Sequence, residues 1–121
     1  MLILSLSILN SKLFFGETGD GGNIDVLFSN SDNIYVHSVI SENPTTITGF
    51  PKDDHIYGYG ILITINSKNK KYTSMQLYIP HNSASSIESG YIYIRTFADG
   101  SSLSTKTWRK FNPSSINEAI F

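Results

Sequence analysis

Lys71-Tyr-Thr-Ser-Met-Gln-Leu-Tyr-Ile79 and Gly90-Tyr-Ile-Tyr-Ile-Arg-Thr-Phe97 decide the fold, because both stretches alternate between two kinds of side chain. Successive side chains of a β-strand point to opposite faces, so each stretch predicts a strand with two chemically different faces. We expect the aliphatic face, with residues such as Leu77 and Ile94, to build the core. The opposite face is then expected to present tyrosine, glutamine and arginine to a partner.

Three more strand-like stretches complete the predicted sheet, at residues 34–40, 58–66 and 107–111. Turn-rich linkers between short strands are typical of a small all-β domain. The linker at 41–57 is long, and loops of that length in a compact domain tend to be functional or to cover something. Residues 24–28 suit either one helical turn or a short strand. The sequence therefore predicts an all-β fold: a small antiparallel sheet or sandwich with long loops and a short apolar N-terminal segment.

The distribution of glycine predicts the domain organisation. Residues 16–23 hold four of the nine glycines, which suggests a flexible joint. We therefore expect an N-terminal strand or stalk segment at 1–23, a β domain at 24–111 and a C-terminal tail at 112–121. Residues 1–9 are mostly apolar, as in a signal peptide. No basic residue precedes them and no small-residue cleavage site follows them, so a signal peptide is not expected.

Composition excludes several kinds of site. The net charge is −1 and no basic run is present, which argues against nucleic-acid binding by phosphate neutralisation. The chain has no cysteine, so it has neither disulfides nor thiolate metal sites. His37, His55 and His81 lack metal-ligand spacing, and neither a metal nor a cofactor is expected. Charged residues are only 16 %, so the surface is expected to be polar but weakly charged.

A series of short motifs resembles a known family. They are, in order, Tyr35, Glu42-Asn-Pro44, Gly60-Ile-Leu62, Gln76-Leu-Tyr78, Tyr93-Ile-Arg95 and Trp108-Arg-Lys-Phe111. Over residues 24–111 this order resembles the pyocin-knob-type domain, which occurs in tail fibres of bacteriophages and of phage-tail-like bacteriocins. The resemblance implies a virion tail-fibre or receptor-binding protein, often a homotrimer, that attaches to the host. Its expected partners are a bacterial surface carbohydrate and other tail-fibre or baseplate proteins, with no nucleic acid and no membrane insertion.

The candidate ligand-binding residues are mostly those of the tyrosine-rich face, since tyrosine combines an apolar ring with a polar tip. They are Tyr72, Gln76, Tyr78, Tyr91, Tyr93, Arg95, Trp108, His81 and Asn82. Structural roles are also open, since a second sheet or a neighbouring subunit can pack over the whole face. Arg95 can stack on a neighbouring tyrosine or pair with Asp99 or Glu88, and Trp108 can pack in the core. The ligand contacts can instead belong to the loops around 43–57 and 80–90.

We expect non-covalent adhesion to a host-surface glycan. The alternative is a purely structural module that caps or trimerises a fibre. The third hypothesis is a polysaccharide-degrading tail enzyme. It is disfavoured because glycoside hydrolysis needs two carboxylates at a defined separation. The loop carboxylates Asp53, Asp54, Glu88 and Asp99 show no preferred pair, and no Gly-x-Ser-x-Gly motif is present. The chain is therefore not expected to be an enzyme.

Overall fold

The protein is mostly β and contains a single six-stranded sheet. A computed structural model describes residues 12–29, 31–53, 56–67, 74–81, 91–97 and 107–111. The strands are β1 (Leu13–Thr18), β2 (Asn33–Ile40), β3 (Tyr59–Asn66), β4 (Ser74–Pro80), β5 (Ile92–Phe97) and β6 (Arg109–Phe111). Two short 3₁₀ turns, η1 (Asp25–Leu27) and η2 (Pro44–Thr46), complete the described elements. The predicted all-β class is confirmed, and residues 24–28 form a helical turn rather than a strand.

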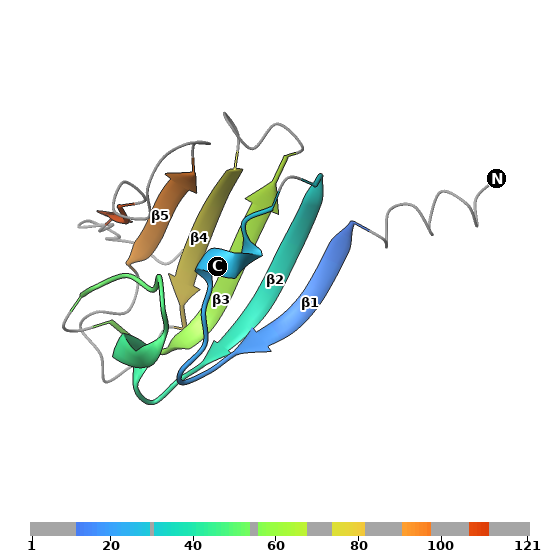
Figure 1. The fold of residues 1–121 in the computed structure, drawn as a ribbon. Helices are drawn as coiled ribbons and strands as arrows, with labels where there is room; N and C mark the ends of the chain where they lie inside the picture. Colours follow the sequence, from blue (N-terminus) through green and yellow to red (C-terminus); the bar gives the residue numbers. More distant parts are fainter. Residues whose placement is uncertain are drawn as a thin grey trace, which may run out of the picture.

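The strands follow one another across the sheet in sequence order, from β1 to β6 (Figure 1). Strands β2 to β6 pair antiparallel, whereas β1 pairs parallel with β2. Residues 13–18 therefore belong to the same sheet as the rest of the chain, and the predicted flexible joint at 16–23 begins inside a strand. Within the described residues, no helix is long and apolar enough to cross a membrane.

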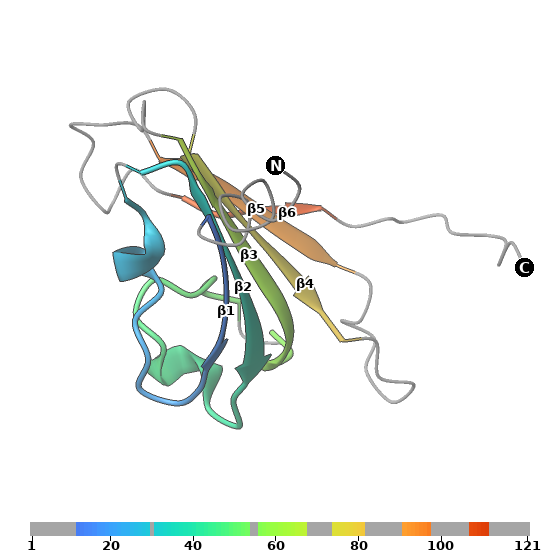
Figure 2. The same ribbon diagram turned by 90° about the vertical axis from the view of Figure 1, so that its right-hand side faces the viewer.

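Two long connections, as far as the structure describes them, lie on one side of the sheet. The described parts of residues 19–32, between β1 and β2, and of residues 41–58, between β2 and β3, cross the same face, as the edge-on view shows (Figure 2). Backbone hydrogen bonds join the two connections. The amide of Ile24 donates to the carbonyl of Thr48 (3.0 Å), and the amide of Thr48 donates to that of Gly22 (2.8 Å). The predicted long loop at 41–57 thus covers part of the sheet.

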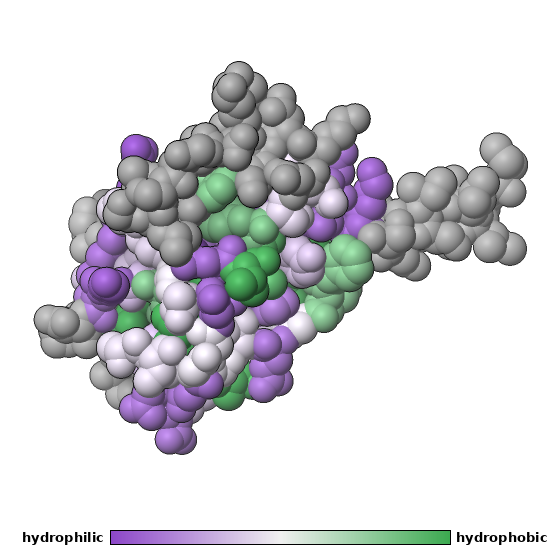
Figure 3. All heavy atoms as spheres, viewed as in Figure 1, coloured by the Kyte–Doolittle hydropathy of each residue, from purple (hydrophilic) through white to green (hydrophobic). Residues whose placement is uncertain are grey.

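The core forms between this covered face and the two connections. Its buried hydrophobic residues are Ile24, Val39, Ile47, Phe50, Leu62, Tyr78 and Tyr93. Ile24, Ile47 and Phe50 come from the connections rather than from strands, so the covering layer supplies much of the apolar surface. Seen from this side, the outside of the covering layer is largely hydrophilic or intermediate in hydropathy (Figure 3).

The prediction of which face is buried was wrong. Gln76, Tyr78, Tyr93 and Arg95, expected on an open face, are all buried. On the opposite face, the aliphatic residues of β4 and β5 expected in the core are half-buried or exposed; they are Met75, Leu77, Ile79, Ile92 and Ile94. Alternation separates two faces correctly, but the side on which the connections pack decides which one becomes the interior.

Candidate functional site

A buried network of polar side chains lies at the centre of the covered face. The Gln76 amide nitrogen donates to the carbonyl of Ile24 (2.8 Å) and to the Thr64 hydroxyl (3.0 Å). Its oxygen accepts a hydrogen bond from Nε of Arg95 (2.8 Å). The guanidinium of Arg95 also donates to Oδ1 of Asp25 at 2.8 Å. Because these buried groups have partners, the network ties strands β3 to β5 to the turn η1, and the hydrogen bonds offset part of the cost of removing the groups from water.

Aromatic rings enclose the guanidinium of Arg95. Its central carbon lies 4.8 Å from the ring centre of Trp108 and 5.3 Å from that of Phe28. Burial lowers the pKa of Arg95, and the hydrogen bond and charge of Asp25 oppose that shift. An arginine side chain remains protonated in proteins, so a buried cation sits here between rings and one carboxylate. Arg95 pairs with Asp25; the acids considered from the sequence, Glu88 and Asp99, lie outside the described residues.

Trp108 attaches the long loop to the far edge of the sheet. Its indole nitrogen donates to the carbonyl of Gly49 at 2.8 Å. Gly49 has a positive φ of 85°, and a Cβ added there would lie 2.3 Å from Oδ1 of Asp25. Only glycine fits this backbone conformation and this close approach. Trp108 therefore packs against the core with its N–H bonded, as the structural interpretation of this residue expects.

Two tyrosines of the covered face fix neighbouring segments through their hydroxyls. Tyr78 donates to the carbonyl of Tyr57 at 2.5 Å. Burial is the main cause that raises the pKa of Tyr78, and electrostatic repulsion from Tyr57 is the second. Tyr93 donates to Oδ2 of Asp53 at 2.8 Å. These hydroxyls thus hold the C-terminal part of the residue 41–58 connection, at Asp53 and Tyr57, against strands β4 and β5.

An ion pair forms the outer rim of the site. The ammonium of Lys110 lies 2.7 Å from Oδ2 of Asp53, the same oxygen that accepts from Tyr93. It also lies 3.8 Å from the ring centre of Tyr91, a cation–π distance. Both charged side chains are partly exposed. They form a charged surface beside an aromatic ring.

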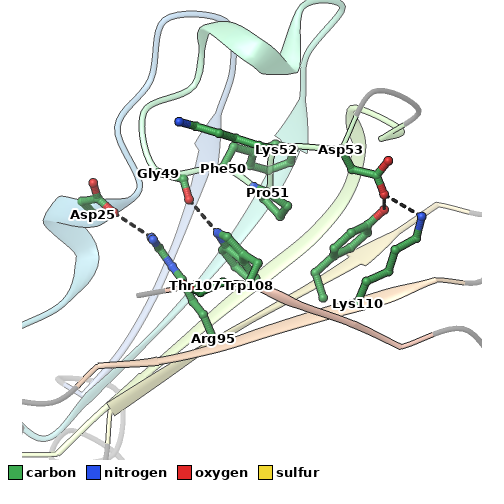
Figure 4. Close-up of a pocket in the computed structure, with 11 residues that line it drawn as sticks. Asp25, Gly49, Phe50, Pro51, Lys52, Asp53, Arg95, Thr107, Trp108 and Lys110 are labelled. Atoms are coloured by element: carbon green, nitrogen blue, oxygen red, sulfur yellow. Dashed lines mark hydrogen bonds and ion pairs between the residues drawn. The ribbon is translucent and has the colours of Figure 1, made fainter. Parts of the chain in front are cut away.

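A pocket of about 730 Å³ opens between the residue 49–53 loop and the strands β5 and β6 (Figure 4). Its lining residues are Asp25, Gly49, Phe50, Pro51, Lys52, Asp53, Tyr93, Arg95, Thr107, Trp108 and Lys110. Ligand pockets in proteins commonly enclose about 300–1,000 Å³ and combine apolar walls with a few placed polar groups. This pocket offers an indole, carboxylates and ammonium groups, which suit a polar ligand with an apolar face. A second hollow, of about 460 Å³, is lined by residues 44–53 of the same loop.

The structure separates the predicted site residues into three groups. Tyr93, Arg95 and Trp108 come together as walls of the pocket. Gln76 and Tyr78 are fully buried and have structural partners, so the described residues of the predicted tyrosine face do not form one continuous open surface.

The remaining predicted residues lie elsewhere. Tyr91 is half-buried beside Lys110, and His81 is exposed, with its ring 6.4 Å from that of Tyr57. Tyr72 and Asn82 lie outside the described residues.

Sequence reasoning did not identify Asp25 or Lys110 as part of a site. The Asp25–Arg95 pair spans 70 residues of sequence, and no local pattern connects its members. Residues 49–53, which belong to one of the two loops considered for ligand contacts, form the loop wall of the pocket. Whether those residues contact a ligand remains a prediction.

Comparisons with protein-family models, with curated proteins and with solved structures give no match to this chain. The resemblance to the pyocin-knob-type domain therefore rests on the sequence motifs alone. In the structure those motifs occupy mainly the covered face, where Gln76, Tyr78, Tyr93 and Arg95 build the interior. A motif of interior residues describes an architecture more directly than a ligand.

Proposed function

We propose that this chain is a receptor-binding domain of a phage tail fibre, which adheres non-covalently to a bacterial surface glycan. The binding site is the pocket between the residue 49–53 loop and strands β5 and β6. The observation that carries the proposal is the combination, in one pocket, of Trp108 with the Asp53–Lys110 pair. The motif resemblance supplies the biological setting, and the pocket supplies the chemistry.

The pocket chemistry suits carbohydrate. Sugar rings present apolar C–H faces that pack on aromatic side chains, while their hydroxyls exchange hydrogen bonds with carboxylates and ammonium groups. Asp53 is already held by Tyr93 and Lys110, and Trp108 is held by Gly49. Groups fixed before binding lose little conformational entropy when a ligand arrives. Weak binding at one site would gain strength from several copies on one fibre.

The arrangement of the pocket carboxylates favours binding over hydrolysis. Asp25 pairs with Arg95, and Asp53 pairs with Lys110. A glycosidase needs one carboxylic acid that keeps its proton until it protonates the leaving group. Each pocket aspartate is already engaged by a basic side chain of the same chain, an arrangement that suits a fixed hydrogen-bonding group. We therefore propose adhesion without cleavage.

The test is adhesion of the purified, fluorescently labelled chain to a panel of bacterial cells and to polysaccharides extracted from them. Lys110→Ala should lower binding about tenfold or more, because it removes the rim cation and one of the contacts that hold Asp53. Lys12→Ala is the matched control: Lys12 is an exposed lysine that precedes β1, at the opposite edge of the sheet. Thermal unfolding of both variants should show that the fold is retained.

Two results would overturn the proposal in different ways. Equal binding by the Lys110 and Lys12 variants would mean that the chain binds the glycan at a surface other than the pocket. Absence of binding by the unmodified chain, with binding by neighbouring fibre domains, would favour the structural capping module instead. Release of reducing ends from an extracted polysaccharide would favour the enzyme.

A further inference from the structure

The side of the sheet opposite the connections is an open apolar surface, here called the open face. Strand pairing aligns its central row across five strands: Phe15 beside Val36, then Ile63, Leu77 and Ile94. Parallel rows on both sides are also rich in isoleucine. None of the strand residues that point to this side is buried. Phe15 is 75 % exposed and Ile61 is 41 % exposed.

This surface is about as large as the largest apolar patch of a typical monomeric protein. Six strands about 4.8 Å apart span roughly 24 Å, and six residues of strand extend about 20 Å, which gives a flat area of roughly 500 Å². The largest apolar patch on a typical monomer measures about 300–600 Å², and such patches are often functional. No described segment covers it (Figure 2). The open face therefore has the size of a patch that proteins commonly use for an interaction.

The two charged residues among the described strand residues of the open face lie at its opposite edges. Glu17 is on β1, and Arg109 is on β6. Arg109 pairs with Ile94 in the central row, whereas Glu17 pairs with Ser38 in the next row, about 7 Å away along the strands. They are too far apart to meet within one chain, since the width of the sheet separates them. A second copy can bring them together.

We propose that the open face packs against the open face of other copies of this chain, around a symmetry axis that runs along the strands. Such an axis places the β1 edge of one copy beside the β6 edge of the next, and so joins Glu17 to Arg109 of a neighbour. Two copies would form a sandwich of sheets about 10 Å apart. Three copies would form a triangular prism with the isoleucine side chains inside. This inference does not depend on the proposed glycan adhesion.

The first experiment measures the mass of the full chain by sedimentation equilibrium. We expect two or three times 13.5 kDa for the unmodified chain. Leu77→Asp places a charge at the centre of the open face and should reduce the mass to that of one chain. Thr45→Asp, at an exposed position of the covering layer, is the matched control and should leave the mass unchanged. A monomeric unmodified chain, or an assembly that survives Leu77→Asp, would overturn the proposal.

The second experiment stays informative if Leu77→Asp fails to fold. Because the chain has no cysteine, Glu17→Cys and Arg109→Cys together provide one thiol at each edge of the sheet. A short bismaleimide should join these chains into closed dimers or trimers, which denaturing electrophoresis resolves. Each single-cysteine variant should remain mostly unlinked. Linking by Glu17→Cys alone would show that the β1 edges of two copies meet one another. No linking by the double variant would show that the β1 and β6 edges do not meet. Either result contradicts the proposed axis.

Discussion

The two faces of the sheet differ in a way that inverts the usual distribution of polar and apolar residues. The covered face buries glutamine, arginine, threonine and two tyrosines, whereas the open face consists mainly of isoleucine, leucine, valine and phenylalanine. The difference shows that the chain connections, and not the hydropathy of a face, decide which side becomes the interior of one subunit. The open face is also the side on which an additional partner could bury apolar side chains.

The covered face tolerates burial because its polar groups are paired. Asn66 illustrates this, as its amide donates to the carbonyl of Leu27 and to Oδ1 of Asn33, both at 2.8 Å, and accepts from the amide of Ser29. Among the described side chains, only the hydroxyl of Ser74 is buried without a partner. Polar residues then fix the arrangement of the covering layer, because each of them demands a particular neighbour.

The largest expected effect comes from breaking the buried ion pair of the covered face. Asp25→Ala leaves the charge of Arg95 buried between rings without its carboxylate. Removal of one partner of a buried pair costs about 3–5 kcal/mol of unfolding free energy. Urea denaturation followed by tryptophan fluorescence measures this loss, since Trp108 lies against the guanidinium. Glu42→Ala, at an exposed carboxylate, should change stability by less than about 0.5 kcal/mol.

A double variant identifies the cause of that loss. Asp25→Ala combined with Arg95→Met removes both charges and should be more stable than Asp25→Ala alone, because no unpaired charge remains. If the double variant is less stable than the single one, Arg95 stabilises the covered face through its packing and its hydrogen bond to Gln76 even without Asp25. The ion pair would then contribute less to the covered face than those other contacts of Arg95.

The sequence predicts the strands better than their burial. Alternation at residues 71–79 and 90–97 predicts two strands, and the structure contains β4 and β5 in those regions. Which face lies inside depends on Ile24, Ile47 and Phe50, which two distant connections carry onto the polar side. Those contacts are long-range, and no local pattern encodes them. The parallel pairing of β1 with β2 is likewise not encoded by a local pattern, since it depends on the path of the chain between these strands.

The pocket residues were also predictable only where local sequence is informative. Tyr93, Arg95 and Trp108 could be selected by residue type and alternation, and all three line the pocket. Their partners could not be selected, because Asp25 and Gly49 approach them only after the covering layer folds over the sheet. Residue type identifies groups that need a partner, and tertiary structure decides which partner they find.

A smaller expected effect compares adjacent residues of β3 that point to opposite faces. Leu62 is completely buried, whereas Ile61 is 41 % exposed. Leu62→Ala should lower the unfolding free energy by roughly 3 kcal/mol, since it removes buried methyl groups and leaves a cavity. Ile61→Ala should cost less than about 1 kcal/mol if both are measured in the Leu77→Asp background, in which the chains are expected to be monomeric. Equal losses would mean that something covers the open face even in a monomer.

The smallest expected effect concerns His37, a half-buried residue on the covered face of β2. Its Nδ1 lies 2.8 Å from the hydroxyl of Thr18, and the paired Gly16 leaves room for the ring, since a Cβ there would lie 2.7 Å from Nε2. Burial lowers the pKa of His37 below its ordinary value of 6.5. Between the lowered pKa and 6.5, the unfolded chain therefore binds more protons than the folded chain, so the protein should lose stability as the pH falls through 6.5. Urea denaturation at pH 7.5 and at pH 5.5 measures the change.

Two variants assign this pH dependence to the covered face. His37→Gln keeps a hydrogen-bonding group near Thr18 but cannot take up a proton, so the part of the pH dependence due to His37 should disappear. His81→Asn removes an exposed histidine and should retain that part, because His37 is still present. An unchanged pH dependence in His37→Gln would mean that its imidazole is as well solvated in the folded chain as in the unfolded one. The covered face would then admit water at β2, and the difference between the two faces would be confined to strands β3 to β5.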